Sequence, residues 1–466
     1  MGANVPGRFA GLCNYKLLLG ETIMSNGMLP SYLSMAKPNP ADKRAPWYKG
    51  TAPVYAGIFL WVVFYMNIAD GTLSKAGLGL SILGLVVGAL ICYFLFYLVP
   101  GLLGMKTGYP LYVVGSSTYG TNGGFLMPGL LMGLLQFGWL AVNSAVSTKF
   151  ILQACDADAT PGTPTFIIVA IIWTVLAVFV ALKGIQYVGK VSTFLPIVPL
   201  VMILLVFFTN VGSAGNFKPT PGADASEGFL TIIAIVVGFF ATAGAAGVDF
   251  GMGNRNSKDV QLGGVVGIML AILVAGGLPL IAIAGAHAAN PAMKGFTFDA
   301  VISAQGGLLA KSMFILFAIA SFAPACFSSF IAANSIGTMF PKANKVIMVS
   351  IGGVIAIILA ATGKALNLVG VFSIIGASFG PICGAMVADY FLSGQKWAGP
   401  RKGVNLAGYI SWAIGFVVAI LPTINAEKFG FISPAPVIAF FIGLVVYALL
   451  AKAGLQPPAV EMTQNK

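Results

Sequence analysis

Twelve stretches of this chain are long and apolar enough to cross a lipid bilayer as helices. A spanning helix needs about 20 apolar residues, because it must cross roughly 30 Å of hydrocarbon. The connections between the stretches are short, so the sequence predicts an all-α membrane protein with about 12 transmembrane helices. The candidates are 52–72, 78–100, 126–151, 164–183, 191–209, 228–248, 261–287, 309–338, 345–362, 366–393, 404–423 and 436–453.

The composition excludes several classes of protein. The chain is 58% hydrophobic and 8% charged, whereas soluble domains carry about a quarter charged residues. The net charge of +12 does not indicate a nucleic-acid partner, because the basic residues stand singly in loops. One His, scattered Cys and no GxSxG or P-loop motif leave no catalytic or metal set. We therefore expect no enzyme and no cofactor.

The distribution of Lys and Arg predicts the orientation. With the N-terminus inside, the loops on the inner side carry most of the 25 basic residues. We therefore expect a multi-pass protein of the plasma membrane with both termini in the cytoplasm. Residues 1–50 are mixed and polar, which predicts a cytosolic lead-in.

Two of the apolar stretches should be discontinuous helices. In the first, "FLWVVFYMNIADGT" places Asn67 and Asp70 beside Gly71, and in the sixth, "GFFATAGAAGVDF" becomes a run of small residues. Interrupted helices at corresponding positions of two halves indicate the binding site of a secondary transporter. Close packing of uninterrupted helices remains the alternative.

The third stretch carries a polar and aromatic face. Gln136, Trp139, Asn143 and Ser147 recur at helical spacing, so they share one side. An aromatic plate beside amides suits a flat, neutral heterocycle, which stacks on the indole and hydrogen-bonds to the amide. An amide that only bonds to a neighbouring helix is the alternative.

The eighth stretch offers oxygen ligands for a hard cation. Ala325, Ser328 and Ser329 share one face, and Pro324 should bend the helix. Two hydroxyls and a carbonyl could hold sodium, whereas serines bonding to their own backbone are the alternative. Asn334 lies on a different face, which favours contact with the substrate.

The acidic residues bear on the coupling ion. Of 13 carboxylates, Asp70 is the one expected within the core, while Asp249 and Asp389 should lie at inner helix ends. A proton-coupled carrier usually needs an intramembrane carboxylate or His. We therefore expect sodium coupling, with proton coupling through Asp70 as the alternative.

Several stretches carry a family resemblance. The chain resembles the nucleobase:cation symporter-1 family, and its bacterial cytosine permease and purine-cytosine permease branch most closely. The resemblance implies a leucine-transporter-type five-plus-five inverted repeat with discontinuous helices 1 and 6. It also implies a cytosolic segment at 1–50, a ten-helix core at 51–394, two accessory helices at 395–455 and a cytosolic tail at 456–466. The stretches are "GLLGMKTGYPLYVVGSSTYG", "GWLAVNS", "GFFATAGAAGVDFGMGNRNSK", "FSSFIAAN" and "GASFGPICGAMVADYFL".

The resemblance also implies roles for individual residues. Trp139 would be the stacking aromatic and Asn143 an amide that holds the substrate, as in hydantoin-type members. Phe240, with Phe239 before it, takes the helix 6 aromatic position, and Asn334 matches a helix 8 amide. Sodium would be held by a further set: Ala325, Ser328, Ser329 and helix 1 carbonyls near Phe59 and Val62.

The chain also departs from the pattern of cytosine permeases. These tend to carry Gly at the position of Asn143 and Ser at that of Phe239. Cytosine itself is therefore one candidate beside uracil, a purine, hydantoin, allantoin and a thiamine-related pyrimidine.

The sequence as a whole predicts a symporter. It would import a nucleobase such as cytosine, or a related flat heterocycle, with sodium by alternating access, and its partners would be this small molecule and the lipid bilayer. A proton-coupled nucleobase, allantoin or hydantoin permease is the alternative. A channel fits poorly, because channels use rings of repeated groups from several chains. The oligomeric state stays open.

Overall fold

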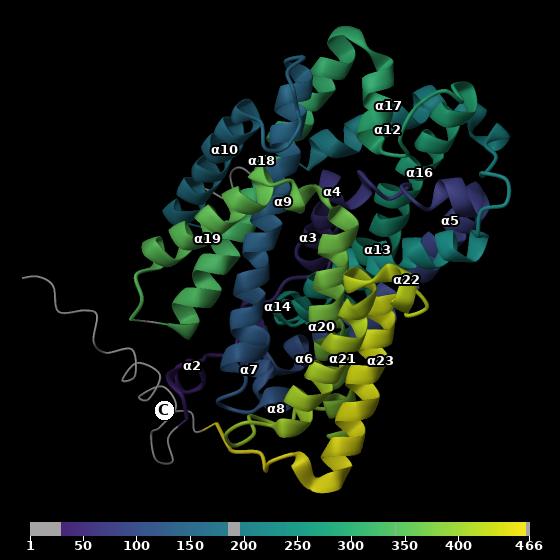
Figure 1. Ribbon diagram of the computed structural model, residues 1–466. Coiled ribbons are helices and arrows are strands. Elements are labelled where there is room, and N and C mark those ends of the chain that lie inside the picture. The colour runs from purple at the N-terminus through teal and green to yellow at the C-terminus, as the bar shows by residue number, and fades with distance from the viewer. Residues whose placement is uncertain (1–28, 185–195, 341, 463–466) are drawn as a thin grey trace, which may run out of the picture.

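The computed structural model describes residues 29–184, 196–340 and 342–462, and these are built almost entirely from helices (Figure 1). Within them, ten helices are long and apolar enough to cross a membrane. They comprise α5 (Leu73–Ile91) with η2 (Cys92–Tyr97) and α6 (Leu98–Thr107), η3 (Phe125–Leu130) with α9 (Leu131–Ala154), α10 (Pro164–Lys183), α12 (Ile197–Asn210) with η4 (Val211–Asn216), α13 (Ala225–Ala245), α15 (Ser257–Gly264) with η5 (Val265–Leu270) and α16 (Ala271–Ala289), α18 (Gly307–Met339), α20 (Leu368–Leu392), α21 (Leu406–Ile424), and α23 (Ala435–Leu450) with η7 (Ala451–Leu455).

Two further helices complete the expected set. The first predicted stretch is divided into α3 (Thr51–Phe59) and α4 (Val62–Tyr65), and the ninth is the shorter α19 (Lys345–Ala361). The predicted start of the fifth stretch, 191–195, lies outside the described residues. The all-helical membrane architecture with about 12 spans is therefore confirmed.

Helix 1 breaks earlier than its polar residues suggested. α3 ends at Phe59, Leu60 follows it, and Trp61 takes an extended conformation (φ −64°, ψ 125°) before α4 begins. Helix 6 divides at Ala246, between α13 and α14 (Gly247–Gly251), inside the predicted run of small residues. Both discontinuities thus fall within the apolar body of the protein.

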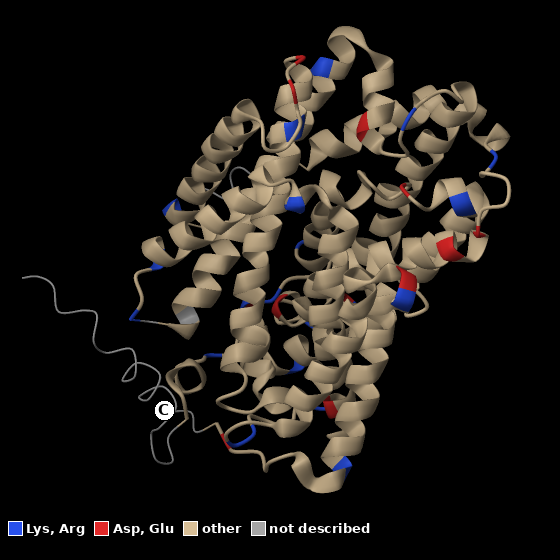
Figure 2. Ribbon diagram, in the orientation of Figure 1, with Lys and Arg blue, Asp and Glu red and all other residues tan. Residues whose placement is uncertain are grey.

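The helices form two packed groups. α9, α10, α18 and α19 pack on one another at one side, whereas α5, α13, α14, α16 and α6 form the second group (Figure 1). α20 packs against α13 and against the last two helices, α21 and α23. Charged residues gather mostly toward the helix ends and loops (Figure 2), which is the distribution expected of helices that face lipid.

The segment before α3 ties together the helix ends beside it. Arg44 Nη1 donates to the carbonyl of Met105 at the end of α6 (2.7 Å), and Asn39 Nδ2 donates to that of Met252 after α14 (3.0 Å). Thr51 Oγ1 donates to Asn254 Oδ1 (2.8 Å) in the same loop. The first half of helix 1 is therefore joined to helix 2 and the second half of helix 6.

A buried polar network holds α23 and the C-terminal tail at the same end of the molecule. Arg401 Nη2 donates to Asp389 Oδ1 (2.7 Å) at the end of α20, and Arg401 Nε donates to the Ser117 carbonyl (2.9 Å) in α8 (Ser116–Tyr119). Tyr447 of α23 and Gln456 of the tail also donate to Asp389 Oδ1 (both 3.0 Å). The network thus fixes α8 to α20, α23 and the C-terminal tail.

We expect Arg401→Ala to destabilise the protein strongly. The Arg401 and Asp389 side chains are only 9% and 5% exposed, so the variant leaves a buried carboxylate without its cation, at a cost of about 3–5 kcal/mol. The measurement is the thermal unfolding midpoint of the purified protein in detergent. Glu227→Gln is the control: it breaks the Lys75–Glu227 pair, in which Glu227 is 57% exposed, and should cost at most about 1 kcal/mol. Equal midpoints for the two variants would contradict this assignment.

Candidate functional site

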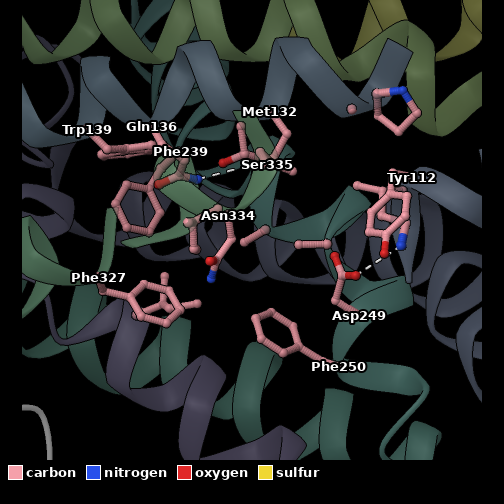
Figure 3. Close-up of a pocket in the computed structure, with 18 of the residues that line it drawn as sticks. Tyr112, Met132, Gln136, Trp139, Phe239, Asp249, Phe250, Phe327, Asn334 and Ser335 are labelled. Atoms are coloured by element: carbon pink, nitrogen blue, oxygen red, sulfur yellow. Dashed lines mark hydrogen bonds between the residues drawn. The ribbon is translucent and has the colours of Figure 1, made fainter. Parts of the chain in front are cut away.

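A cavity of about 310 Å³ lies between the two groups of helices, beside both discontinuities (Figure 3). Its wall is mostly apolar and aromatic, with a few polar groups. Such a surface is typical of a small-molecule site. The wall is formed by Ile58 and Trp61 of helix 1, Leu111 and Tyr112 of α7 (Leu111–Val114), Pro128 and Gly129 of η3, Met132, Gln136 and Trp139 of α9, Phe239, Thr242, Ala243, Ala246, Asp249 and Phe250 of helix 6, and Phe327, Ile331, Asn334 and Ser335 of α18.

Four of the predicted substrate residues line this cavity together. Trp139 and Gln136 enter it from α9, Phe239 from α13 and Asn334 from α18. The Trp139 ring meets the Phe239 ring edge-on at 5.2 Å and the Trp61 ring at 6.0 Å. Among the described residues, Gln136 Nε2 has only the weak acceptor Met132 Sδ (3.7 Å), so its amide is available to a ligand.

Two predicted residues lie behind the cavity wall instead. Asn143 is fully buried, and its Nδ2 donates to the Trp139 carbonyl (2.8 Å), while its Oδ1 has no hydrogen-bond partner within the part of the chain that the structure describes. Phe240 is also fully buried and stacks on Phe59 at 5.6 Å. The predicted polar face of α9 therefore has two environments. Gln136 at one end lines the cavity, whereas Ser147 at the other end donates to the Ala318 carbonyl of α18 (3.4 Å).

The predicted sodium ligands of α18 are buried away from the cavity wall. Ser329 Oγ donates to the Ala325 carbonyl (3.0 Å), the local bond that the sequence left open. Ser328 Oγ is buried and has no hydrogen-bond partner among residues 29–184, 196–340 and 342–462. A buried hydroxyl without a partner is uncommon and suits an ion ligand, so the donor chemistry fits a hard cation.

The helix 1 positions named from the resemblance lie on either side of the break. Phe59 is the last residue of α3 and Val62 the first of α4. The Val62 carbonyl accepts a hydrogen bond from the Met66 amide (2.9 Å). The break thus falls between the two named positions, but the Val62 carbonyl already accepts a hydrogen bond, and the role of both carbonyls as ligands stays a prediction.

Asp70 does not lie in the core, and here the structure corrects the sequence interpretation. Its side chain is exposed and follows the end of α4 at Tyr65, although its neighbours Ile68 and Ala69 are buried. The carboxylate that reaches the cavity belongs to Asp249, whose Oδ1 accepts a hydrogen bond from the Leu111 amide (2.9 Å).

Sequence reasoning also missed other residues of the wall. Trp61 lies at the helix 1 break, Phe327 contacts it at 6.4 Å, and Tyr112 comes from the connection between helices 2 and 3. Only their aromatic character beside an interrupted helix could have indicated them.

The cavity is closed toward α17 (Phe298–Gln305) and accessible toward α7. On the α17 side, the Phe64 ring contacts Phe239 at 4.8 Å, and the Phe298 amide donates to the Met66 carbonyl (2.9 Å). Asp299 pairs there with Lys149 (2.6 Å). On the α7 side, Asn334 is exposed and Asp249 and Phe250 are partly exposed.

Two curated proteins are similar to this chain in sequence. No protein-family model matches the sequence. The cytosine permease of Escherichia coli is 28% identical over 306 residues, which cover 64% of this chain and 67% of that protein. A putative allantoin permease of Escherichia coli is 23% identical over 434 residues, which cover 80% of this chain and 86% of that protein.

Solved structures of membrane transporters have a similar fold. The inward-facing conformation of Mhp1 has a TM-score of 0.69 at 16% identity, over 94% of this chain and 97% of that one. Mhp1, a nucleobase-cation-symport-1 family transporter, in a closed conformation with bromovinylhydantoin bound, has a TM-score of 0.63 at 16% identity, over 92% and 97%. A Na⁺-coupled sialic acid symporter in a substrate-bound outward-open state has a TM-score of 0.53 at 15% identity, over 96% and 97%.

The chain is similar in sequence to a cytosine permease and in fold to Mhp1, a nucleobase-cation-symport-1 family transporter. The family resemblance expected from the sequence is thereby confirmed, as is the leucine-transporter-type fold. The protein is a multi-pass membrane protein of the transporter type, not an enzyme.

In this transporter, we expect Gly244→Leu to disturb the packing of helix 6. A Cβ at Gly244 would lie 2.8 Å from the Cβ of Phe96 and 3.2 Å from the Phe240 ring, so a larger side chain should cost about 1–3 kcal/mol. The measurement is the thermal unfolding midpoint. Gly138→Leu is the control, since no described residue beyond its chain neighbours and its own helix backbone lies within 4 Å of its added Cβ. A midpoint for Gly244→Leu as high as the control's would show that helix 6 is not closely packed here.

Proposed function

We propose that this chain is a symporter that imports a nucleobase such as cytosine, or a related flat heterocycle, with sodium. The observation that carries the proposal is the cavity, where Trp139 lies beside the uncharged amides of Gln136 and Asn334. A flat ring can pack against an indole while its edge exchanges hydrogen bonds with amides. The named relatives, cytosine permease and a putative allantoin permease, support this class of substrate.

Asn143 could hold the substrate only after a change of its side-chain conformation. Its Oδ1 is buried without a partner, directly behind the Trp139 backbone that its Nδ2 contacts. An unpaired buried oxygen is costly, so a substrate donor that reached it would be favoured. Phe240 would act indirectly, by supporting Phe59 at the helix 1 break.

The proposed conformation is inward-facing. Aromatic packing and α17 close one end of the cavity, while its accessible end lies toward α7 and the C-terminal tail. The positive-inside bias of the loops supports a cytoplasmic position for that tail. Alternating access would then require the two groups of helices to close around Asn334 and Tyr112.

Sodium is the favoured coupling ion. The unpaired Ser328 hydroxyl and the nearby Ser329 and Ala325 oxygens are hard ligands. The proton alternative through Asp70 is weakened because this carboxylate is exposed, away from the cavity.

The test of substrate class is a binding screen on the purified protein, with cytosine, uracil, adenine, hypoxanthine, hydantoin and allantoin. We expect at least one heterocycle to bind. Trp139→Ala should weaken every binding heterocycle together, by roughly 2- to 12-fold, because each ring offers a π-face. Trp173→Ala is the control, since Trp173 lies on α10 and does not line the cavity. A screen without any binding heterocycle would overturn the proposed function.

The test of coupling is substrate binding against sodium concentration at two pH values. Sodium should raise substrate affinity by about 5- to 150-fold, the usual range of linkage. Ser328→Ala and Ser329→Ala should each raise the sodium needed for half-maximal binding, and saturating sodium should restore substrate affinity. Asp70→Asn should leave sodium dependence intact. Binding that ignores sodium, follows pH and is lost in Asp70→Asn would establish the proton alternative instead.

A further inference from the structure

Asp249 is the one charged side chain among the described residues that line the cavity. It belongs to α14 and lies between Tyr112 and Phe250 in the close-up view (Figure 3). The described wall contains no Lys, Arg or His. A carboxylate in a mostly apolar cavity without a cation is costly, so its presence calls for a ligand or a structural partner.

The Leu111 amide occupies only one of the acceptor sites of the Asp249 carboxylate. Oδ1 accepts one hydrogen bond, from the Leu111 amide at 2.9 Å. Among the described residues, no ion pair and no second hydrogen bond to Asp249 is found. A carboxylate has about four acceptor sites, so lone pairs remain for a molecule inside the cavity.

The groups around Asp249 suit the edge of a flat ring. Tyr112 and Phe250 provide aromatic surface next to the carboxylate, and Asn334 provides an amide from the opposite helix group. A carboxylate accepts N–H donors, and it repels carbonyl oxygens and anions. The amides of Gln136 and Asn334 can donate as well as accept, so they do not impose this choice.

We propose that Asp249 makes the transporter selective for heterocycles that present N–H donors, above all an amino group, over those that present a carbonyl oxygen or a negative charge. The proposal rests on the proposed function, because it names the substrate class of the same cavity. It assigns the specificity to the second half of helix 6 rather than to the amides of α9 and α18.

The alternative is that Asp249 only holds α7 to helix 6 through Leu111. Two substitutions separate these roles. Asp249→Asn keeps an Oδ1 acceptor for the Leu111 amide, but it removes the charge and turns the other atom into a donor. Asp249→Ala removes the contact with Leu111 as well. Asp70→Asn is the matched control, since it removes one exposed carboxylate outside the cavity.

The experiment measures competition binding to the full chain near neutral pH with two matched pairs, cytosine against uracil and adenine against hypoxanthine. Each pair exchanges an amino group for a carbonyl oxygen. We expect the wild type and Asp70→Asn to prefer the amino member by about tenfold or more, as a hydrogen bond to a charged group allows. In Asp249→Asn the preference should fall below about threefold or reverse, with an unfolding midpoint close to that of the wild type.

The outcomes are distinguishable. If no heterocycle binds the wild type, the proposed function fails, and this inference fails with it. If the wild type binds heterocycles without preferring the amino members, or if Asp249→Asn keeps the preference, the inference alone is overturned. If Asp249→Asn and Asp249→Ala weaken both members of each pair equally and lower the midpoint, Asp249 is a structural contact only, which also overturns it.

Discussion

The break in helix 1 is the constraint on which the rest of the site depends. A helix interrupted within a membrane frees backbone groups, which must be buried in protein or line a cavity. Here Phe59 stacks on Phe240 on one side of the break, and Trp61 contacts Trp139 on the other. These aromatic contacts hold the broken helix against α13 and α9, and the cavity opens beside them.

A chain of contacts joins the site to distant parts of the protein. Leu111 bonds to Asp249 in the cavity, and α8, a few residues further on, is fixed to the buried Arg401 and through it to Asp389. The accessory helices and the tail thus hold the connection between helices 2 and 3 that forms the accessible end of the cavity. A loss of this network should affect the shape of that end as well as stability.

Part of the site was accessible from the sequence, because helical spacing alone places Gln136 and Trp139 on one face. The same spacing could not separate Asn143 from them, since whether a residue meets a cavity or a neighbouring helix depends on where α18 crosses α9. Asp70 was misplaced because the break at Trp61 carries no polar signal. Asp249 was expected at an inner helix end, whereas it lies within α14, beyond the division of helix 6, and lines the cavity.

The sequence by itself determined that this protein lies in a lipid bilayer and that it is built from helices. About 20 apolar residues per stretch leave a chain no alternative to helices in lipid, since each backbone hydrogen bond must be made within the segment. The runs of small residues also placed the helix 6 discontinuity. Only the tertiary structure decided which polar groups meet: Asp249, Gln136 and Asn334 come from three helices far apart in sequence. Their juxtaposition depends on crossing points between helices, and periodicity within one helix contains no information about those.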